Sequence, residues 1–460
     1  MFLESRMKRW RPAGGPPPDR LLRFSHPSTG HALYTLGDKG KDYKPTKIFP
    51  KLGTSKHKDT FKRNIVAHFM PKTYPNGTRP EYATYSAYTA TSTALGSAAG
   101  VLSTQALLCA VGMDQTSALP LAASFNWVLK DGLGQLAAVI SAAAISNQFD
   151  DDPKRWRAVS ALCEVGARVF ESVAPLAPTL FLPIASVSNL GKSVACLAAS
   201  ATRARFHAHL SLSGGLADVT AKAGSQSIVA SLSGTGIGLG ISLFFVNAPT
   251  DVLLAVSALG VAQLAATEAS LKCLGLPTLT RDAVTTLIEA YLSGSKLPLP
   301  DEYSKSLHHL APTWNLFPVK SRNGSIHSGV VTQFGSTSLE ELIESPADLL
   351  ELENALRERR HFTRIQARSG HLKVSTLLLE GATSSDIILG LLHESLLVAE
   401  IKRANRFALE NEEWRKEALQ QTHLVACNHC DAFIKELQDG GWDVESATIA
   451  EDVSSRICLT

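Results

Sequence analysis

The sequence has few of the features that mark secreted domains and uniformly membrane-embedded chains. Charged residues make up 19% of its 460 residues, below the roughly 25% of soluble domains. A mean hydropathy of +0.04 is nevertheless too low for a chain that is membrane throughout. The seven cysteines have no regular spacing, which excludes a disulfide framework. Residues 1 to 13 are basic but lack the apolar run of about 7 to 15 residues of a secretory signal, so we expect none.

Motifs of the common catalytic classes are also missing. The sequence contains no G-x-S-x-G, H-E-x-x-H or P-loop pattern, and its glycine-rich stretch lacks the spacing and the preceding strand of a dinucleotide site. The short pairs FHAH, with His207 and His209, and CNHC, from Cys427 to Cys430, do not supply the four ligands of a structural zinc site. We therefore predict no enzymatic activity, no catalytic residue, no cofactor and no metal.

Positive charge is concentrated near the N-terminus. Residues 1 to 81 carry 17 Lys and Arg against 6 Asp and Glu, a net of about +11, although the whole chain is +3. A basic arm can contact nucleic acid, attract anionic lipid or hold a segment on the positive side of a membrane. Because an apolar segment follows directly, we favour membrane orientation and predict no nucleic-acid partner. The Gly, Pro and Lys content of residues 1 to 60 predicts a largely disordered basic arm.

Long charge-free segments follow the arm. Tyr82 to Met113 has no Asp, Glu, Lys or Arg across 32 residues, whereas a spanning helix needs about 20. The alternative is a buried helix of a soluble bundle. Ala223 to Thr250 is the clearest candidate span, and its glycines form two overlapping GxxxG spacings that favour close helix packing. These are Gly234, Gly236, Gly238 and Gly240. Three prolines between Ser172 and Gly191 predict a kinked or broken helix.

The composition changes after Gly275. Residues 276 to 313 read as a linker with a short helix, and residues 314 to 460 as a small soluble α+β domain. In that domain we predict a helix from Ser345 to about Arg360 and a hairpin over Phe362 to Leu379. Thr383 to Asp386 should cap a long helix that continues to Trp414. The predicted fold is thus mainly α, with a polytopic helical membrane module of kinked or broken helices at residues 61 to 275.

Ionisable and amide side chains interrupt the apolar segments. A charge at the centre of a bilayer costs roughly 2.5 to 3.5 kcal/mol on insertion scales, so such residues pair, line a watery path or bind a ligand. We hypothesise that eight of them converge on one site for a small anionic molecule. The alternative is that they are separate anchors at helix ends. They are Lys130, Asp131, Asn189, Lys192, Arg203, Asp218, Lys222 and Gln226.

Several of these residues lie in long motifs of one family. The motifs include FNWVLKDGLGQL at Phe125 to Leu136, KRWR at Lys154 to Arg157, SVSNLGKSV at Ser186 to Val194 and LADVTAKAGSQ at Leu216 to Gln226. Through them the sequence resembles the root UVB-sensitive (RUS) family over about residues 69 to 275, with a weaker continuation to the C-terminus. The resemblance implies a membrane-associated protein tied to vitamin B6 homeostasis and to seedling responses to ultraviolet light. It supplies no catalytic residues.

Two functions fit the residues and the resemblance together. The first is a non-enzymatic membrane carrier or homeostasis factor for a small anionic metabolite, with a vitamin B6 vitamer as the candidate that the family motivates. The second is a membrane scaffold whose C-terminal domain binds a protein partner. The expected partners are the lipid bilayer, a small anionic ligand, and a protein partner or a second RUS-type chain. The expected location is a membrane of the plastid, the mitochondrion or the endomembrane system.

Overall fold

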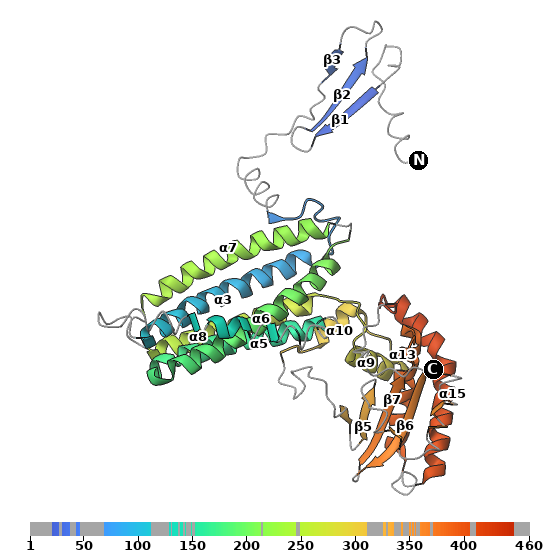
Figure 1. Ribbon diagram of the computed structural model, residues 1–460. Coiled ribbons are helices and arrows are strands. Elements are labelled where there is room, and N and C mark those ends of the chain that lie inside the picture. Colours follow the sequence, from blue (N-terminus) through green and yellow to red (C-terminus); the bar gives the residue numbers. More distant parts are fainter. Residues whose placement is uncertain are drawn as a thin grey trace. The chain divides into compact units, whose positions relative to one another are not determined.

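The chain divides into two compact units, Met1–His68 and Phe69–Thr460. The computed structural model (Figure 1) describes residues 21–26, 30–36, 43–46, 69–111, 152–212, 215–244, 249–310, 359–368, 371–404 and 411–445. It also describes short pieces between residues 128 and 149 and between residues 325 and 355.

The first unit contains a three-stranded antiparallel sheet. Its strands β1 (Leu21–His26), β2 (Gly30–Leu36) and β3 (Tyr43–Thr46) lie in the order β1-β2-β3. These strands lie within the stretch for which the sequence analysis predicts a largely disordered basic arm, whose average composition conceals two short apolar runs.

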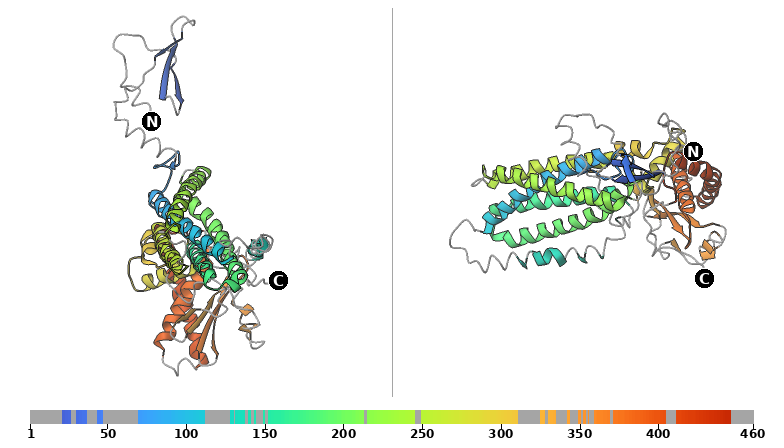
Figure 2. Two further views of the ribbon diagram at one scale, coloured as in Figure 1. Left: turned by 90° about the vertical axis from the view of Figure 1, so that its left-hand side faces the viewer. Right: turned by 90° about the horizontal axis from the view of Figure 1, so that it is seen from above.

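Long helices form most of the second unit. They are α3 (Tyr82–Val111), α5 (Pro153–Ser172), α6 (Phe181–Leu210), α7 (Leu216–Ser242) and α8 (Pro249–Cys273). They run roughly parallel or antiparallel to one another (Figure 2). Helix α3 packs against α7 and α8, while α5 packs against α6 and α8. Asp152 caps α5 by accepting a hydrogen bond from the Arg155 backbone nitrogen, and Pro153 occupies its first turn, as expected for a helix start.

Between α5 and α6 the chain reverses direction. Two short 3₁₀ turns, η2 (Ala174–Leu176) and η3 (Pro178–Leu180), separate Ser172 from Phe181. The two helices then pack antiparallel, since Ser160 Oγ of α5 donates to the Ala195 carbonyl oxygen of α6 and a Cβ on Gly191 would lie 3.4 Å from Ala167 Cβ. Pro175 and Pro178 lie in the first positions of the turns, where a missing backbone N–H is tolerated. The proline-containing segment for which a kinked or broken helix is predicted therefore holds the turn of a helix pair.

Two of the four predicted packing glycines lie at a helix contact. A Cβ on Gly234 would overlap the carbonyl oxygen of Ala94 on α3, and one on Gly238 would lie 2.7 Å from the Ala98 oxygen. At Gly236 and Gly240 an added Cβ would meet no described atom within 4 Å. Only one of the two GxxxG spacings therefore faces α3.

Three helices in the described residues are long and apolar enough to cross a membrane, judged by length and composition alone. They cover Tyr82–Ala110, Pro178–Leu210 and Pro249–Cys273. Helix α7 is not among them, although it contains most of Ala223 to Thr250, the stretch predicted to be the clearest span. Its many Gly and Ser residues dilute its apolar side chains, and Asp218 and Lys222 lie in its first two turns.

The C-terminal region combines a sheet with helices. Strands β4 (Ser325–His327), β5 (Val330–Phe334), β6 (His361–Arg368) and β7 (His371–Leu378) lie in the order β4-β5-β7-β6. The antiparallel pairing of β6 with β7 confirms the predicted hairpin. Strand β5 runs parallel to β7, a long-range pairing that the sequence analysis did not predict. The helix predicted from Ser345 to Arg360 lies mostly outside the described residues.

Helices α13 (Ser384–Arg403) and α15 (Glu412–Asp439) pack together beside the sheet. Thr383 and Asp386 form the predicted capping box at the start of α13. The predicted continuation to Trp414 is wrong, because α13 ends at Arg403 and a new helix begins at Glu412. Asn411 caps this new helix by accepting a hydrogen bond from the Glu413 backbone nitrogen, and acidic residues follow in its first turn, as the helix dipole favours.

The predicted linker contributes to the core of this region. It contains α9 (Arg281–Leu292) and α10 (Pro300–Ser306). Leu287 and Ile288 of α9 lie in one buried cluster with Ile388 of α13 and Phe433 of α15. The chain end also returns to the linker, since the Asp443 backbone nitrogen donates to the Pro277 carbonyl oxygen and Trp442 Nε1 donates to that of Pro298.

Candidate functional site

A closed ring of polar side chains joins α5 to α8 inside the helical bundle. Arg168 Nη2 lies 2.6 Å from Glu164 Oε1, and Arg168 Nη1 donates to Gln263 Oε1 at 3.0 Å. Gln263 Nε2 in turn donates to Glu164 Oε2 at 2.9 Å. Each side chain satisfies the other two, as buried polar networks require. Gly96 of α3 leaves room for Gln263, whose amide would meet a Cβ at that position.

A second ion pair lies beside the turn between α5 and α6. Lys192 Nζ of α6 donates to Glu171 Oε2 at the end of α5. The Glu171 side chain is 2% exposed and that of Lys192 is 31% exposed. Glu171 is therefore a buried carboxylate beside the turn that joins α5 to α6, while its partner reaches the surface of the bundle.

Asn189, one turn before Lys192, brings two sequence motifs together. A Cβ on Gly134, in FNWVLKDGLGQL, would lie 2.8 Å from Asn189 Cγ, in SVSNLGKSV. Asp131 lies three positions before Gly134 in a short helical piece, and residues at this spacing share a helix face. The first two predicted polar interruptions therefore adjoin one another. Lys130, beside Asp131, lies outside the described residues.

The third interruption lies at the start of α7, where it fixes a preceding segment. Asp218 Oδ2 accepts a hydrogen bond of 2.6 Å from the Lys72 backbone nitrogen. Gln226 Nε2 donates to the Phe69 carbonyl oxygen at 2.7 Å and lies 3.4 Å from the Tyr82 hydroxyl. These contacts hold the chain in place immediately before α3. Lys222 lies between Asp218 and Gln226 on the same helix and is half-buried.

The seven predicted site residues that the structure describes lie at different levels of the bundle. Lys192 lies 18 positions before Leu210 at the end of α6, which is about 27 Å along the helix axis. Helix α7, with Asp218, begins only a few residues after Leu210. Arg203 is exposed and 11 positions beyond Lys192. In place of one convergent site, these seven residues form two groups with Arg203 apart, because long helices separate the motifs along the bundle.

A cavity of about 260 Å³ lies where the bundle meets the linker. Its lining includes Lys154, Arg155, Asp282, Tyr303, His309 and Trp442. Lys154 Nζ donates to the Leu274 carbonyl oxygen and, at 2.6 Å, to Ser304 Oγ. Arg155 Nη1 lies 3.9 Å from Asp282 Oδ2. These cationic ends already have protein acceptors, so the KRWR motif attaches α5 to the linker.

Burial disfavours charge at the edge of this cavity. It lowers the pKa of His309 to about 3, with the nearby Lys154 and Lys272 acting in the same direction. Burial likewise raises the pKa of Asp152 above its ordinary value. Desolvation penalises the charged form of each group. The cavity is therefore poorly suited to gaining further charge without a counter-ion.

The sequence analysis missed the ionic partners on α5, which are Glu164, Arg168 and Glu171. This helix alternates polar and apolar residues, a pattern that does not by itself indicate burial. The spacing of Glu164 and Arg168, four positions apart, was an available signal for a pair on one face. The partner of Lys192 lies 21 positions away, a distance for which no local rule exists.

Comparison with known proteins identifies the family. A family model described as the vitamin B6 photo-protection and homoeostasis domain matches residues 55–295, more than half of the chain. The chain belongs to the root UVB-sensitive family. A second model, the root UVB-sensitive protein C-terminal domain, matches residues 325–452. This RUS chain thus matches both family models, and the description of the first is consistent with a role in vitamin B6 homeostasis.

Curated relatives of this RUS protein come from plants and from a social amoeba. The Arabidopsis thaliana protein root UVB sensitive 3 is 25% identical over 83% of this chain and 83% of its own length. Root UVB sensitive 2, chloroplastic, of the same plant is 30% identical over 52% of this chain and 54% of its own length. RUS family member 1 of Dictyostelium discoideum is 28% identical over 40% of this chain and 35% of its own length. No solved structure matches the chain.

Proposed function

We propose that this RUS protein is an integral membrane protein that acts in vitamin B6 homeostasis as a non-enzymatic carrier of a small anionic vitamer. The observation that carries the proposal is the buried Glu171 carboxylate, paired with Lys192 beside the turn between α5 and α6. Ionisable residues inside a membrane mark substrate or ion pathways.

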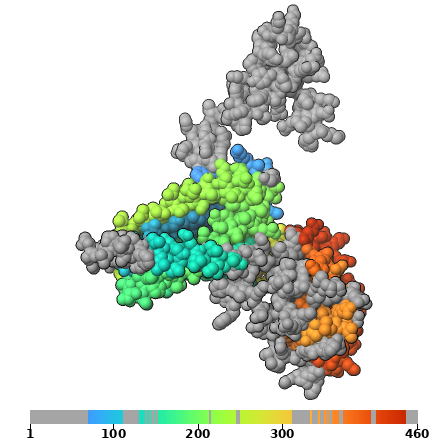
Figure 3. All heavy atoms as spheres, viewed as in Figure 1, coloured from blue at the N-terminus to red at the C-terminus, as the bar shows by residue number. Residues whose placement is uncertain are grey.

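Exposed apolar side chains on the outer surface of the bundle favour a lipid environment. Large apolar side chains on α7 and α8 leave more than half of their surface exposed, and Figure 3 shows α7, in light green, at the surface of the bundle. They are Ile228, Leu232, Ile237, Leu239, Leu254 and Val261. Water-soluble proteins rarely expose so many apolar side chains on one pair of helices, whereas lipid tails solvate them.

Charge decides the kind of molecule that would bind. The Lys192 ammonium is partly accessible and its described partner is the Glu171 carboxylate. A phosphate or carboxylate on a ligand can accept a charge-assisted hydrogen bond from the same ammonium, beside Glu171 or in its place. Phosphorylated vitamin B6 vitamers are anions of this class, and the description of the family's principal domain names that vitamin.

Uptake into vesicles tests the proposal. The full chain is reconstituted into liposomes, and entry of labelled pyridoxal 5′-phosphate and of uncharged pyridoxine is followed over time. We expect saturable uptake of the phosphorylated vitamer, reduced more than tenfold in Lys192→Gln. Lys272→Gln is the control, since Lys272 is likewise paired with an acid, Glu268 of its own helix, but lies at the end of α8. Insertion that resists alkaline extraction, without any uptake, would contradict the carrier.

A second candidate function is a membrane scaffold whose C-terminal domain binds a protein partner. It is favoured by the exposed apolar side chains of Leu424 and Val425 on α15. Purification of the membrane-inserted chain with a stoichiometric partner, lost in Leu424→Asp and retained in the carrier-defective Lys192→Gln, would support this function. Uptake that persists in Leu424→Asp would separate it from the carrier.

A further inference from the structure

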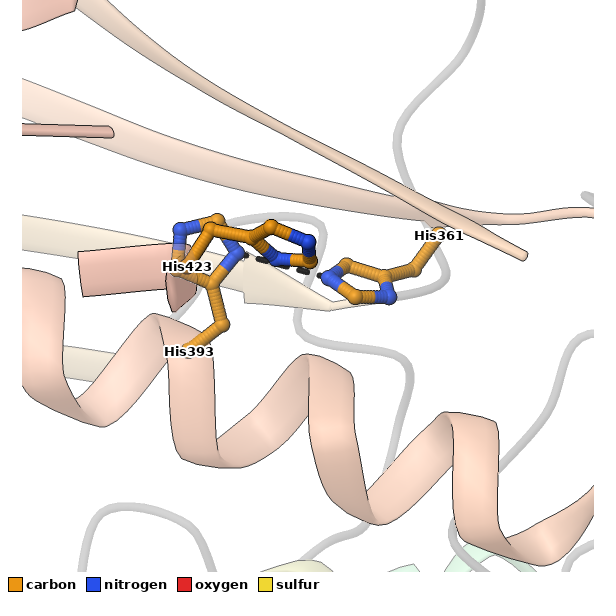
Figure 4. A group of neighbouring side chains, drawn as sticks. All are labelled: His361, His393 and His423. Carbon is orange, nitrogen blue, oxygen red and sulfur yellow. Dashed lines mark hydrogen bonds between the residues drawn. The ribbon is translucent and has the colours of Figure 1, made fainter. Parts of the chain in front are cut away.

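Three histidines from distant parts of the C-terminal region meet in its interior (Figure 4). His361 begins β6, His393 lies in α13 and His423 lies in α15. Their exposed fractions are 2%, 2% and 7%. We refer to these three residues as the histidine trio. One potential ligand atom from each lies within 4.8 Å of those from the other two.

The rings are arranged around a common point rather than stacked. Their centroids are 5.1 to 5.6 Å apart and every pair of ring planes is inclined by 55° to 67°. His361 Nε2 lies 3.4 Å from His393 Nδ1, which is long for a hydrogen bond. Two nitrogens bound at about 2.0 to 2.1 Å to a tetrahedral zinc ion lie about 3.4 Å apart. The separation therefore matches two ligands of one ion.

Neighbouring groups fix which nitrogen of His393 has a free lone pair. His393 Nε2 lies 3.2 Å from the Leu419 carbonyl oxygen, which can only accept, so Nε2 carries the proton and Nδ1 faces the trio. A histidine that binds a metal through one ring nitrogen usually donates its other N–H to a carbonyl or carboxylate, which holds the ring in position. His423 Nε2 lies 3.4 Å from Cys427 Sγ on the next turn.

Packing alone leaves polar atoms of the trio unsatisfied. His361 Nδ1 and His423 Nδ1 are buried and have no hydrogen-bond partner in the part of the chain that the structure describes. Buried polar atoms without partners are rare in native proteins, and each calls for a reason such as an ion or a water. An ion held by His361 Nε2 and His393 Nδ1 would account for His423 Nδ1, but not for His361 Nδ1, which lies on the far side of its ring. Gly390 of α13 also leaves space here, since a Cβ on it would approach the rings of Phe334 and His361.

We propose that the histidine trio binds one first-row transition-metal ion, with Zn²⁺ as its representative. Imidazole nitrogens suit such metals, whereas magnesium and calcium prefer oxygen ligands. Burial, aided by the positive charge of the nearby Arg359, lowers the pKa of each of the three rings.

The bound ion would tie β6, α13 and α15 together. The positive charge of Arg359, which helps to lower these pKa values, also opposes a dication, so affinity must come from the ligand bonds themselves. Cys427 Sγ contacts His423 Nε2 and is not a member of the histidine trio. In the CNHC motif His429 instead contacts Tyr291 and Cys430 enters the core, so the motif is not itself a metal site.

The test uses the full chain purified in detergent, stripped with a chelator and titrated with Zn²⁺ or Co²⁺. We expect one ion per chain by elemental analysis, a visible Co²⁺ spectrum of low-symmetry coordination, and a rise in the thermal midpoint with Zn²⁺. His393→Asn and His423→Asn should weaken binding by more than the about 10- to 100-fold that changes to supporting residues cost. His429→Asn, on the same helix as His423, is the control.

His423→Phe distinguishes a specific loss of metal binding from a loss that results only from unfolding. An apolar ring of similar size should fold and keep its thermal midpoint in chelator, yet lose the Zn²⁺-dependent rise. Absence of metal binding by the unchanged chain, or Zn²⁺ binding that survives in all the trio variants, would overturn the proposal.

Discussion

A Cβ added to Gly238 on α7 would lie 2.7 Å from the carbonyl oxygen of Ala98 on α3. The neighbouring atom is backbone, so the contact cannot be relieved by rotating a side chain. The two helices therefore approach closely only because this position, and Gly234 one turn earlier, lack a side chain.

We expect Gly238→Ala to destabilise the bundle by about 1 to 3 kcal/mol, the usual cost of overpacking. Gly240→Ala is the matched control, because its Cβ would meet no described atom within 4 Å. The control should be neutral or stabilising by up to about 1 kcal/mol through helix propensity. Thermal unfolding in detergent measures both, and equal effects of the two changes would contradict the packing described.

The Glu171–Lys192 pair should be energetically coupled. In a double-mutant cycle with Glu171→Gln and Lys192→Gln, we expect a coupling of about 0.5 to 3 kcal/mol. Lys192→Gln should cost more than Glu171→Gln, because it leaves a buried carboxylate without its described cation, whereas Lys192 is partly exposed.

The exposed pair of Lys416 and Glu412 on α15 provides the reference cycle. Its coupling should not exceed about 0.5 kcal/mol. Denaturant unfolding in mixed micelles measures both cycles. Indistinguishable couplings would mean that the buried pair contributes no more than a surface pair.

Stability at the linker should fall on acidification. The folded chain holds the pKa of His309 at about 3, against an ordinary value of 6.5. Below pH 6.5 the unfolded chain therefore binds a proton that the folded chain does not, so stability is lost progressively from pH 6.5 towards pH 3. His309→Gln should flatten this slope, by at most about 1.4 kcal/mol per pH unit.

His308→Gln is the control for this pH dependence. His308 adjoins His309 but is exposed, and its Nδ1 lies 3.3 Å from Lys272 Nζ. Unfolding followed at several pH values should show the same slope as the unchanged chain. A slope that His309→Gln leaves unaltered would assign the acid sensitivity to other groups.

Asp218 should hold the segment before α3 in place. Asp218→Ala removes the acceptor for the Lys72 backbone N–H, so we expect faster hydrogen exchange at Lys72 and its neighbours. Ser225→Ala is the control on the same helix, since Ser225 Oγ bonds only to its own helix, at the Ala221 carbonyl oxygen. Unchanged exchange in Asp218→Ala would show that other contacts fix the segment.

Local sequence signals predicted local structure well. The alternation from Phe362 to Leu379 gave the β6–β7 hairpin, and Thr383 with Asp386 gave the start of α13. Both depend on residues a few positions apart. The end of α13 was mispredicted because apolar periodicity continues past Arg403, while the decisive signal is the Asn411 cap of the next helix.

Long-range relationships could not be predicted from the same signals. Gly234 and Gly236 look alike in the sequence, and only the position of α3 decides which of them faces a neighbour. The histidine trio has no motif spacing, because its members lie about thirty positions apart on three different elements. The family could be recognised because its motifs are long. These motifs also contain residues that form contacts between helices, so a motif does not by itself indicate a ligand site.

The contact of Trp442 with Pro298 constrains the order in which the protein is built. Trp442 Nε1 reaches the Pro298 carbonyl oxygen, its ring lies beside that of Tyr303, and Asp443 bonds to Pro277. During synthesis the linker leaves the ribosome well over a hundred residues before these partners do. Trp442 is therefore the last residue to join the lining of the cavity between the bundle and the linker. The cavity is complete only after the helices on its other side have been made.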